Sequence, residues 1–72
     1  MATEMGTKIR QRRVSLGMRR KELAARIGKS YDYVAGIENG HKRGSPETLV
    51  DIARALNMPI ELVLPRDWTG AA

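Results

Sequence analysis

Met18–Gly40, which reads MRRKELAARIGKSYDYVAGIENG, is the stretch that decides the fold. Apolar residues three and four apart indicate two short helices in it, one over Arg20–Ile27 and one that Ser30 begins. Gly28 stands where the first of them must end and the chain must turn, and Ser30 offers an oxygen that can cap the second. Two short helices joined by a glycine turn predict a helix-turn-helix motif, although an ordinary helix pair of a small bundle has the same outline.

Composition limits the remaining possibilities. The chain has 72 residues, 42% of them hydrophobic, with no Phe and no Cys, so we expect one all-α domain with an aliphatic core and no disulfide. No segment resembles a signal peptide or reaches the ~18–20 apolar residues of a membrane span, so we expect a cytoplasmic protein without membrane contact. His41 is the single histidine and has neither a second ligand nor a nucleophile beside it in the sequence. We therefore expect no metal, no cofactor and no enzyme activity.

The positive charge is concentrated in one part of the chain. The net charge is +5, but the segment from Lys8 to Lys29 holds nine basic residues against the single acid Glu22. From Ser30 onward, acidic residues outnumber basic ones. Such a one-sided segment favours a polyanionic partner, and double-stranded DNA is the obvious candidate. A basic face that serves solubility alone is the alternative.

Three further helices are expected around the central pair. Thr3 can cap a helix that reaches about Leu16, with Met5, Ile9 and Leu16 on one apolar stripe. Ser45-Pro46-Glu47 combines a cap, a proline at the first helical position and an acid, and so predicts another helix start.

A short fifth helix is expected after Met58-Pro59. The domain is then expected to span residues 3–65, followed by a tail over residues 66–72. Trp68 in that tail either folds back over the core or contacts a second subunit or another protein.

Basic residues gather where a helix normally has a cap. Arg19-Arg20-Lys21 begins the helix that ends at Ile27, and each exposed cation there is unfavourable by ~0.3–1 kcal/mol. A DNA phosphate at this helix start would turn that repulsion into attraction. Lys42 and Arg43, in the loop His41–Gly44, can hold the DNA backbone in the same way, or they are solvated side chains of an ordinary turn.

The helix that Ser30 begins has an outward face opposite Val34 and Ile37. Asp32 on that face either complements the helix dipole or accepts a hydrogen bond from cytosine N4. Tyr31 can offer its hydroxyl group to a phosphate or a base, and Tyr33 can equally be a packing residue. The residues that face outward are Tyr31, Asp32, Ala35, Gly36 and Asn39.

A buried ion pair is expected between two of the helices. Arg13 lies at the edge of the apolar stripe of the first helix, where its guanidinium group needs an acidic partner. Glu38 follows Ile37 at the inner end of the helix that Ser30 begins. We predict a structural Arg13–Glu38 pair, whose disruption would cost ~3–5 kcal/mol if it is buried.

Spacing over most of the chain resembles that of a known family. The motifs are Ile9-Arg10-x-x-Arg13, Gly17-Met18, Glu22-Leu23-Ala24, Ile27-Gly28, Ser30, Val34, Ile37-Glu38-x-Gly40, Pro46-x-x-Leu49, Ile52-Ala53 and Leu56. Over about Met5–Leu64 they are similar to the lambda-repressor/Cro family of bacterial and phage DNA-binding domains, also called the XRE family. The resemblance implies a compact five-helix lambda-repressor-like domain whose third helix enters the DNA major groove.

The resemblance also assigns site residues, with two departures from the family pattern. Arg19-Arg20 replaces the usual Ser-Gln, and the third helix lacks the Gln, Arg or Asn that usually reads a base, so part of the specificity can come from DNA shape or a partner. Arg13 and Glu38 match the family's buried ion pair. We expect base contacts from Tyr31, Asp32, Ala35 and Gly36 and phosphate contacts from Arg19, Arg20, Tyr33, Asn39, Lys42 and Arg43.

Two functional hypotheses follow. The first is a sequence-specific transcriptional regulator, a repressor that binds a pseudo-palindromic operator as a homodimer, with half-sites ~34 Å apart. The second is a protein-interaction module of the same fold, such as an adaptor or an antitoxin-like partner, that uses the Tyr31 and Tyr33 surface. The concentration of basic residues favours the first.

Overall fold

The computed structural model describes residues 3–63, and these fold into four α-helices and one short 3-10 helix. No strand occurs within this range. In chain order the elements are α1 (Glu4–Ser15), α2 (Arg20–Ile27), α3 (Tyr31–Asn39), α4 (Pro46–Leu56) and the 3-10 helix η1 (Ile60–Leu62). The predicted domain boundary at residue 65, the tail and Trp68 lie outside the described residues.

Two expectations about these elements were wrong. The fifth helix is a single 3-10 turn, because the amide N–H groups of Leu62 and Val63 donate to carbonyl groups three residues back and the helix then stops. Val63 still reaches the core from that turn. Leu16 does not extend the apolar stripe of α1, because the helix ends at Ser15 and the Leu16 side chain is 45% exposed.

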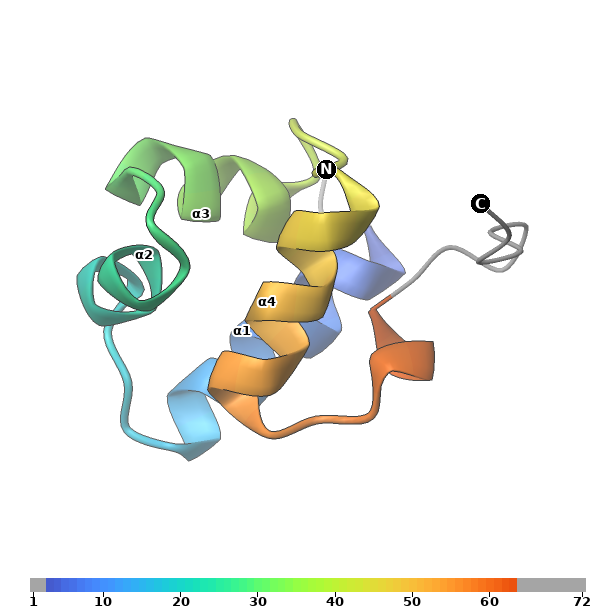
Figure 1. The fold of residues 1–72 in the computed structure, drawn as a ribbon, viewed down its shortest axis with the longest axis horizontal. Coiled ribbons are helices and arrows are strands. Elements are labelled where there is room, and N and C mark those ends of the chain that lie inside the picture. The colour runs from blue at the N-terminus through green and yellow to red at the C-terminus, as the bar shows by residue number, and fades with distance from the viewer. Residues whose placement is uncertain (1–2, 64–72) are drawn as a thin grey trace.

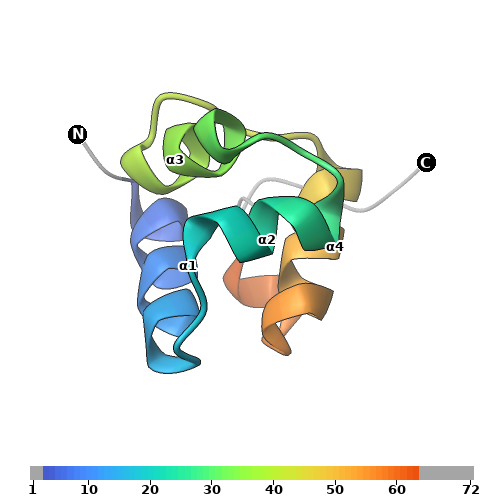
Figure 2. The same cartoon turned by 90° about the vertical axis from the view of Figure 1, so that its left-hand side faces the viewer.

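The helix α3 lies across one end of the molecule. In Figures 1 and 2 it runs along the top, above α1, α2 and α4, and it contacts both α1 and α2. The helix α4 packs against α1 and α2, and η1 packs against α4. The outer side of α3 is therefore left uncovered by the other helices.

The core between these helices is aliphatic, as expected. Met18 is folded into it just after α1, although it belongs to no helix. Among the buried residues that the structure describes, Thr48 is the one with an uncharged polar side chain. Its hydroxyl group lies 2.9 Å from that of Ser45, within hydrogen-bonding distance. The largest fully buried apolar side chains are Ile9, Leu23, Val34, Ile37, Leu49, Ile52, Leu56 and Val63.

Helix starts and ends follow the sequence signals closely. The hydroxyl oxygens of Thr3, Ser30 and Ser45 each accept a hydrogen bond from a backbone N–H group in the first turn of α1, α3 and α4. Gly28 ends α2 with a φ of 69°, the left-handed conformation expected at that turn. The caps predicted at Thr3, Ser30 and Ser45 and the glycine turn predicted at Gly28 are therefore confirmed.

A glycine allows α1 and α3 to approach very closely. A Cβ atom placed on Gly6 would lie 2.5 Å from the carbonyl oxygen of Ile37 and 2.6 Å from that of Glu38. Both neighbours are backbone atoms and cannot move aside without separating the helices. Gly6 therefore fixes the distance between α1 and the last turn of α3.

An arginine of α1 holds the end of α4. Arg12 Nε donates a 2.8 Å hydrogen bond to the carbonyl oxygen of Leu56, and its Nη2 lies 3.4 Å from that of Asn57. Asn57 itself has a φ of 50° and ends α4. A cation at this position satisfies carbonyl groups that the helix leaves unpaired and complements its dipole.

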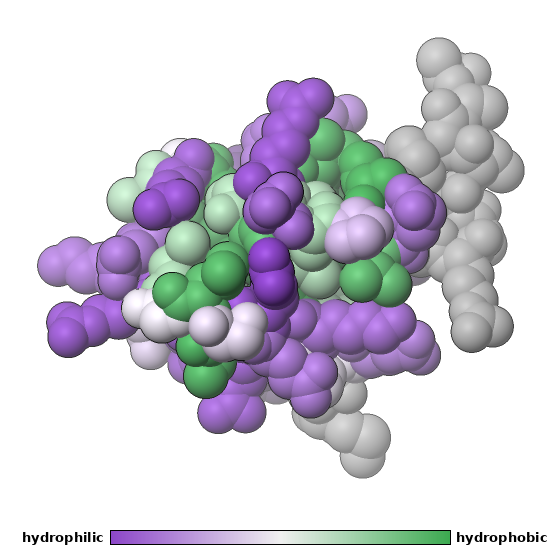
Figure 3. Space-filling view, turned by 90° about the horizontal axis from the view of Figure 1, so that it is seen from below, coloured by the Kyte–Doolittle hydropathy of each residue, from purple (hydrophilic) through white to green (hydrophobic). Residues whose placement is uncertain are grey.

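The face opposite α3 carries scattered apolar side chains. Figure 3 shows this face from below, with green apolar groups separated by purple hydrophilic ones. Single exposed apolar residues of this kind are normal for a small domain. None of the helices in the described range is long and apolar enough to cross a membrane.

Candidate nucleic-acid interface

The outward side of α3 is a short surface, and most of its side chains take no part in the core. Asp32 and Asn39 are exposed, Tyr31 is 51% exposed and Ala35 is half-buried. Val34 and Ile37 point into the core instead. At 1.5 Å per residue, the nine residues of α3 span ~13 Å. An α-helix with its side chains is ~10–12 Å across, which fits a B-DNA major groove ~12 Å wide.

Glu38, on the inner side of α3, is a buried acid with two arginine partners. Arg13 Nε and Nη2 donate to its two carboxylate oxygens at 2.7 and 3.1 Å, and Arg20 Nε donates to Oε1 at 2.9 Å. Arg13 Nη1 also donates to the carbonyl oxygen of Met18 at 2.8 Å. The structure thus brings together the residues paired from the sequence, and it adds Arg20. The Arg13–Glu38–Arg20 cluster connects α1, α2 and α3.

Arg20 also reaches the outward side of α3. Its Nη1 lies 3.4 Å from the Tyr31 hydroxyl oxygen, and its guanidinium carbon is 6.0 Å from the centre of the Tyr31 ring. The hydrogen bond to Tyr31, followed by the one to Glu38, raises the pKa of the Arg20 guanidinium group above its already high usual value. Arg20 therefore keeps its charge at every working pH, with one end of the group at Glu38 and the other at Tyr31.

A basic hollow lies where α2 begins. It has a volume of about 430 Å³ and is bounded by the end of α1, the start of α2 and Tyr31. The start of α2 lacks a side-chain cap, and the N–H group of Arg19 instead donates to the Glu22 carboxylate at 3.1 Å. None of the residues that line the hollow is acidic; they are Arg10, Arg13, Val14, Met18, Arg19, Arg20, Lys21 and Tyr31.

The loop after α3 folds back over the helix. The backbone N–H groups of His41 and Lys42 both donate to the carbonyl oxygen of Gly36, at 2.8 and 3.0 Å. The aliphatic stem of Lys42 then lies over Gly36, close to where a side chain at that position would start. Gly36, expected to touch a base, is thus buried, and Lys42 forms the surface above it.

Tyr33 lies at the flank of α3 that Lys42 crosses. Its ring is half-buried, with Lys42 Nζ 5.9 Å and Lys29 Nζ 5.4 Å from the ring centre. Sequence reasoning missed Lys29, because this residue belongs to the turn before α3, where helical spacing does not indicate which side chains meet. Arg43, in the same loop as Lys42, is exposed.

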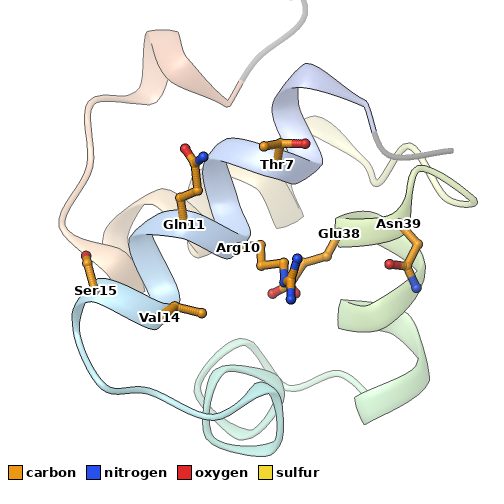
Figure 4. Close-up of a pocket in the computed structure, with 7 residues that line it drawn as sticks. All are labelled: Thr7, Arg10, Gln11, Val14, Ser15, Glu38 and Asn39. Carbon is orange, nitrogen blue, oxygen red and sulfur yellow. The ribbon is translucent and has the colours of Figure 1, made fainter.

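A second hollow, of about 420 Å³, lies between α1 and the end of α3 (Figure 4). Within the range that the structure describes, no three His, Asp or Glu side chains gather so that they could hold a metal ion. Glu38 is the one acid at this hollow, and Arg13 and Arg20 already neutralise it. The residues that line it are Thr7, Arg10, Gln11, Val14, Ser15, Glu38 and Asn39.

Three of the cations expected at phosphate groups therefore lie on the same side of the molecule as the outward face of α3: Arg19, Arg20 and Lys42. Arg20 contacts Tyr31, Arg19 lines a hollow with Tyr31, and Lys42 covers Gly36. Had the cations lain on the side opposite α3, a single anion-binding surface would have been ruled out.

Comparison with known proteins places this arrangement among transcriptional regulators. The profile of a protein family described as "Helix-turn-helix" matches residues 9–63. An uncharacterized transcriptional regulator in the ATPase CF(0) region of Rhodospirillum rubrum is 42% identical over 57 residues, which is 79% of this chain and 53% of that protein. The chain thus spans about half the length of that relative.

Solved structures with the same fold include a repressor and a controller protein. The P22 c2 repressor in complex with synthetic operator 9T has a TM-score of 0.81 and 28% identity, over 90% of this chain and 98% of that one. The restriction-modification controller protein C.AhdI from Aeromonas hydrophila has a TM-score of 0.79 and 26% identity, over 85% of this chain and 92% of that one.

Proposed function

Since the chain belongs to the helix-turn-helix family, in its lambda-repressor-like (XRE) branch, we propose that it is a sequence-specific DNA-binding regulator that inserts α3 into the major groove. One observation carries this proposal. The outward side of α3 is flanked by cations on both sides, by Arg20 beside Tyr31 and by Lys42 across Gly36. Such a surface matches a groove of base edges between two phosphate backbones.

The proposed contacts fall into two groups. Tyr31, Asp32 and Ala35 are exposed or half-buried on the outward side of α3 and would meet base edges directly. Gly36 could touch a base only if the stem of Lys42 moved away from it. Residues at the edges of this surface would contact phosphate groups: Arg19, Arg20, Tyr33, Asn39, Lys42 and Arg43.

We further propose that the protein is a repressor that binds a pseudo-palindromic operator as a homodimer. The P22 c2 repressor, with the same fold, was solved on a synthetic operator. The molecule has a longest dimension of 32 Å, so one copy can place one α3 in one groove. Reading two half-sites one helical turn apart, ~34 Å, takes two copies.

Binding to random double-stranded DNA across a salt series tests this function. We expect the logarithm of the binding constant to fall linearly with that of the salt concentration, because each phosphate contact releases counterions. Arg19→Ala should weaken binding to all sequences and lower the slope by ~0.9. Arg54→Ala is the matched control, since Arg54 is also an exposed arginine but lies in the last turn of α4, at the end away from α3 (Figure 1).

A response that does not change with salt, or no binding, would contradict the proposed function. An interaction module that binds another protein would then be the better interpretation of this surface. If Arg19→Ala and Arg54→Ala reduced the affinity for DNA equally, net charge alone would drive binding, without a defined contact at the start of α2.

A further inference from the structure

We propose that Lys42, a loop residue, reads a base pair from above Gly36 and so acts as part of the recognition surface of α3. This inference rests on the proposed function and goes beyond it. It replaces the phosphate contact given to Lys42 above by a role in sequence discrimination, whereas a position in a basic loop by itself indicates only a phosphate contact.

Lys42 occupies the place that a side chain at position 36 would take. A Cβ atom built on Gly36 would lie 2.9 Å from both Cγ and Cδ of Lys42 and 3.1 Å from its Cε. The two 2.9 Å distances are too short for real contacts, so the stem in this position and a side chain at 36 exclude each other. Because Gly36 has no side chain, the aliphatic stem of Lys42 fills this space, which we call the seat of Lys42.

The backbone of the loop holds Lys42 over this seat. The carbonyl oxygen of Gly36 accepts hydrogen bonds from both the His41 and the Lys42 N–H groups. The stem therefore leaves the loop directly beside the last turn of α3. Less conformational entropy is then lost on binding than for a lysine in a free loop.

The seat lies on the outward face of the helix. Gly36 is four residues after Asp32 and three before Asn39, so all three positions share one side of α3. Asp32 and Asn39 are exposed there, and Lys42 Nζ lies 5.9 Å from the centre of the half-buried Tyr33 ring. A helix that enters the major groove would carry Lys42 in with it.

The chemistry of an ammonium group selects the base. It donates three hydrogen bonds and accepts none, and guanine offers two acceptors, O6 and N7, on its major-groove edge. The outward side chains of α3 hold no arginine, lysine or glutamine of their own. Lys42 therefore supplies the positively charged donor for guanine that the helix sequence lacks.

Lys29 offers a matched comparison. Its Nζ is 5.4 Å from the same Tyr33 ring that Lys42 Nζ approaches to 5.9 Å, so the two ammonium groups have the same charge and a common neighbour. Lys29 belongs to the turn before α3, and its stem is not among the atoms nearest to Gly36. The two lysines differ mainly in whether they cover the outward face of the helix.

Selection of bound sequences from a random oligonucleotide pool tests the inference, with wild type, Lys42→Ala, Gly36→Ala and Lys29→Ala in parallel. Lys42→Ala should lose a preference for guanine at one position of each half-site, by about 5- to 150-fold against the other bases. Gly36→Ala should lose the same preference, because its methyl group displaces the stem while the exposed lysine moves aside. Lys29→Ala should weaken all sequences alike and leave the selected motif unchanged.

The possible outcomes distinguish a failure of the proposed function from a failure of the role inferred for Lys42. If the wild type selects no motif, the proposed function fails. If the wild type selects a motif and Lys42→Ala changes only affinity, as Lys29→Ala does, then Lys42 is a phosphate contact and the inference is overturned. A motif changed by Lys42→Ala but not by Gly36→Ala would overturn the role of Gly36 as its seat. Thermal unfolding curves of the variants establish that each is folded before its motif is compared.

Discussion

Glu38 is a residue whose removal should strongly destabilise the fold. Its side chain is fully buried and neutralised by Arg13 and Arg20 from two other helices. Glu38→Ala would leave both guanidinium groups without their acid, so we expect a loss of about 3–5 kcal/mol in the free energy of unfolding, a large share of the total for a domain of this size. Urea denaturation measures this loss.

The control for this prediction is Glu61→Ala, because Glu61 is exposed in η1. It should change the free energy of unfolding by less than about 0.5 kcal/mol. A Glu38→Ala variant as stable as Glu61→Ala would show that the cluster contributes nothing to folding.

Among residues 3–63, Gly6 should be the glycine that is hardest to replace. An added Cβ would meet the backbone oxygens of Ile37 and Glu38, so Gly6→Ala should cost about 3 kcal/mol or more, at or above the upper end of overpacking effects. At Gly17, with a φ of 68° and no atom within 4 Å of an added Cβ, alanine should cost only about 1–2 kcal/mol. Denaturant unfolding of both variants would contradict this account if the order were reversed.

Arg20 should show two effects where Arg19 shows one. Arg20 is bonded to Glu38 and to Tyr31, so Arg20→Ala should both lower the melting temperature and weaken DNA binding. Arg19 is exposed, so Arg19→Ala should weaken binding with an unchanged melting temperature. Melting curves without DNA and binding curves at one salt concentration separate the two effects, and equal melting temperatures would contradict the role of Arg20 in the cluster.

At the residue scale, the sequence predicts what depends on spacing along one helix. Arg13 at the edge of an apolar stripe and Glu38 beside Ile37 could be paired because each faces inward on its own helix. The second partner of Glu38 could not be predicted, because whether Arg20 points to solvent or to the core depends on how α2 crosses α3. For the same reason, neither the close approach at Gly6 nor the covering of Gly36 by Lys42 has a signal in the sequence.

At the scale of elements, the three helices that begin with a capping hydroxyl group start where the sequence predicts, and the segment expected to form a fifth helix does not form one. Thr3, Ser30 and Ser45 mark their helices because a hydroxyl group satisfies an N–H group that the helix leaves free. The segment after Pro59 has apolar residues but no such cap, and it forms one 3-10 turn.

The end of α4 is held by a contact from α1, and this contact can be tested. Arg12→Ala removes the hydrogen bonds to the Leu56 and Asn57 carbonyl oxygens, so we expect a loss of about 1 kcal/mol, reduced by partial exposure. Arg12→Lys keeps the charge but cannot make both contacts with the same geometry, so it should restore only part of the stability lost in Arg12→Ala. Hydrogen exchange at the end of α4 should accelerate in both variants, and unchanged exchange would contradict this role.

At the scale of the whole molecule, size and charge set what can be bound. A longest dimension of 32 Å allows one copy to cover about one turn of DNA. We therefore expect the motif selected from a random pool to contain two inverted half-sites centred ~34 Å apart, and complexes with two protein copies in analytical ultracentrifugation. A single half-site bound by one copy would contradict the proposed homodimer but not the proposal that the protein binds DNA through α3.

The separation between the two sides of α3 has a consequence for engineering. The inner side carries Val34, Ile37 and Glu38, which the fold requires, whereas Asp32 and Asn39 on the outer side are exposed and Ala35 is half-buried. A library randomised at positions 32, 35 and 39 should therefore keep its scaffold intact while it samples new operators. In such a library position 42 would have to be varied as well. Lys42 lies outside α3, but its backbone is hydrogen-bonded to Gly36 and its stem covers the outer side of the helix.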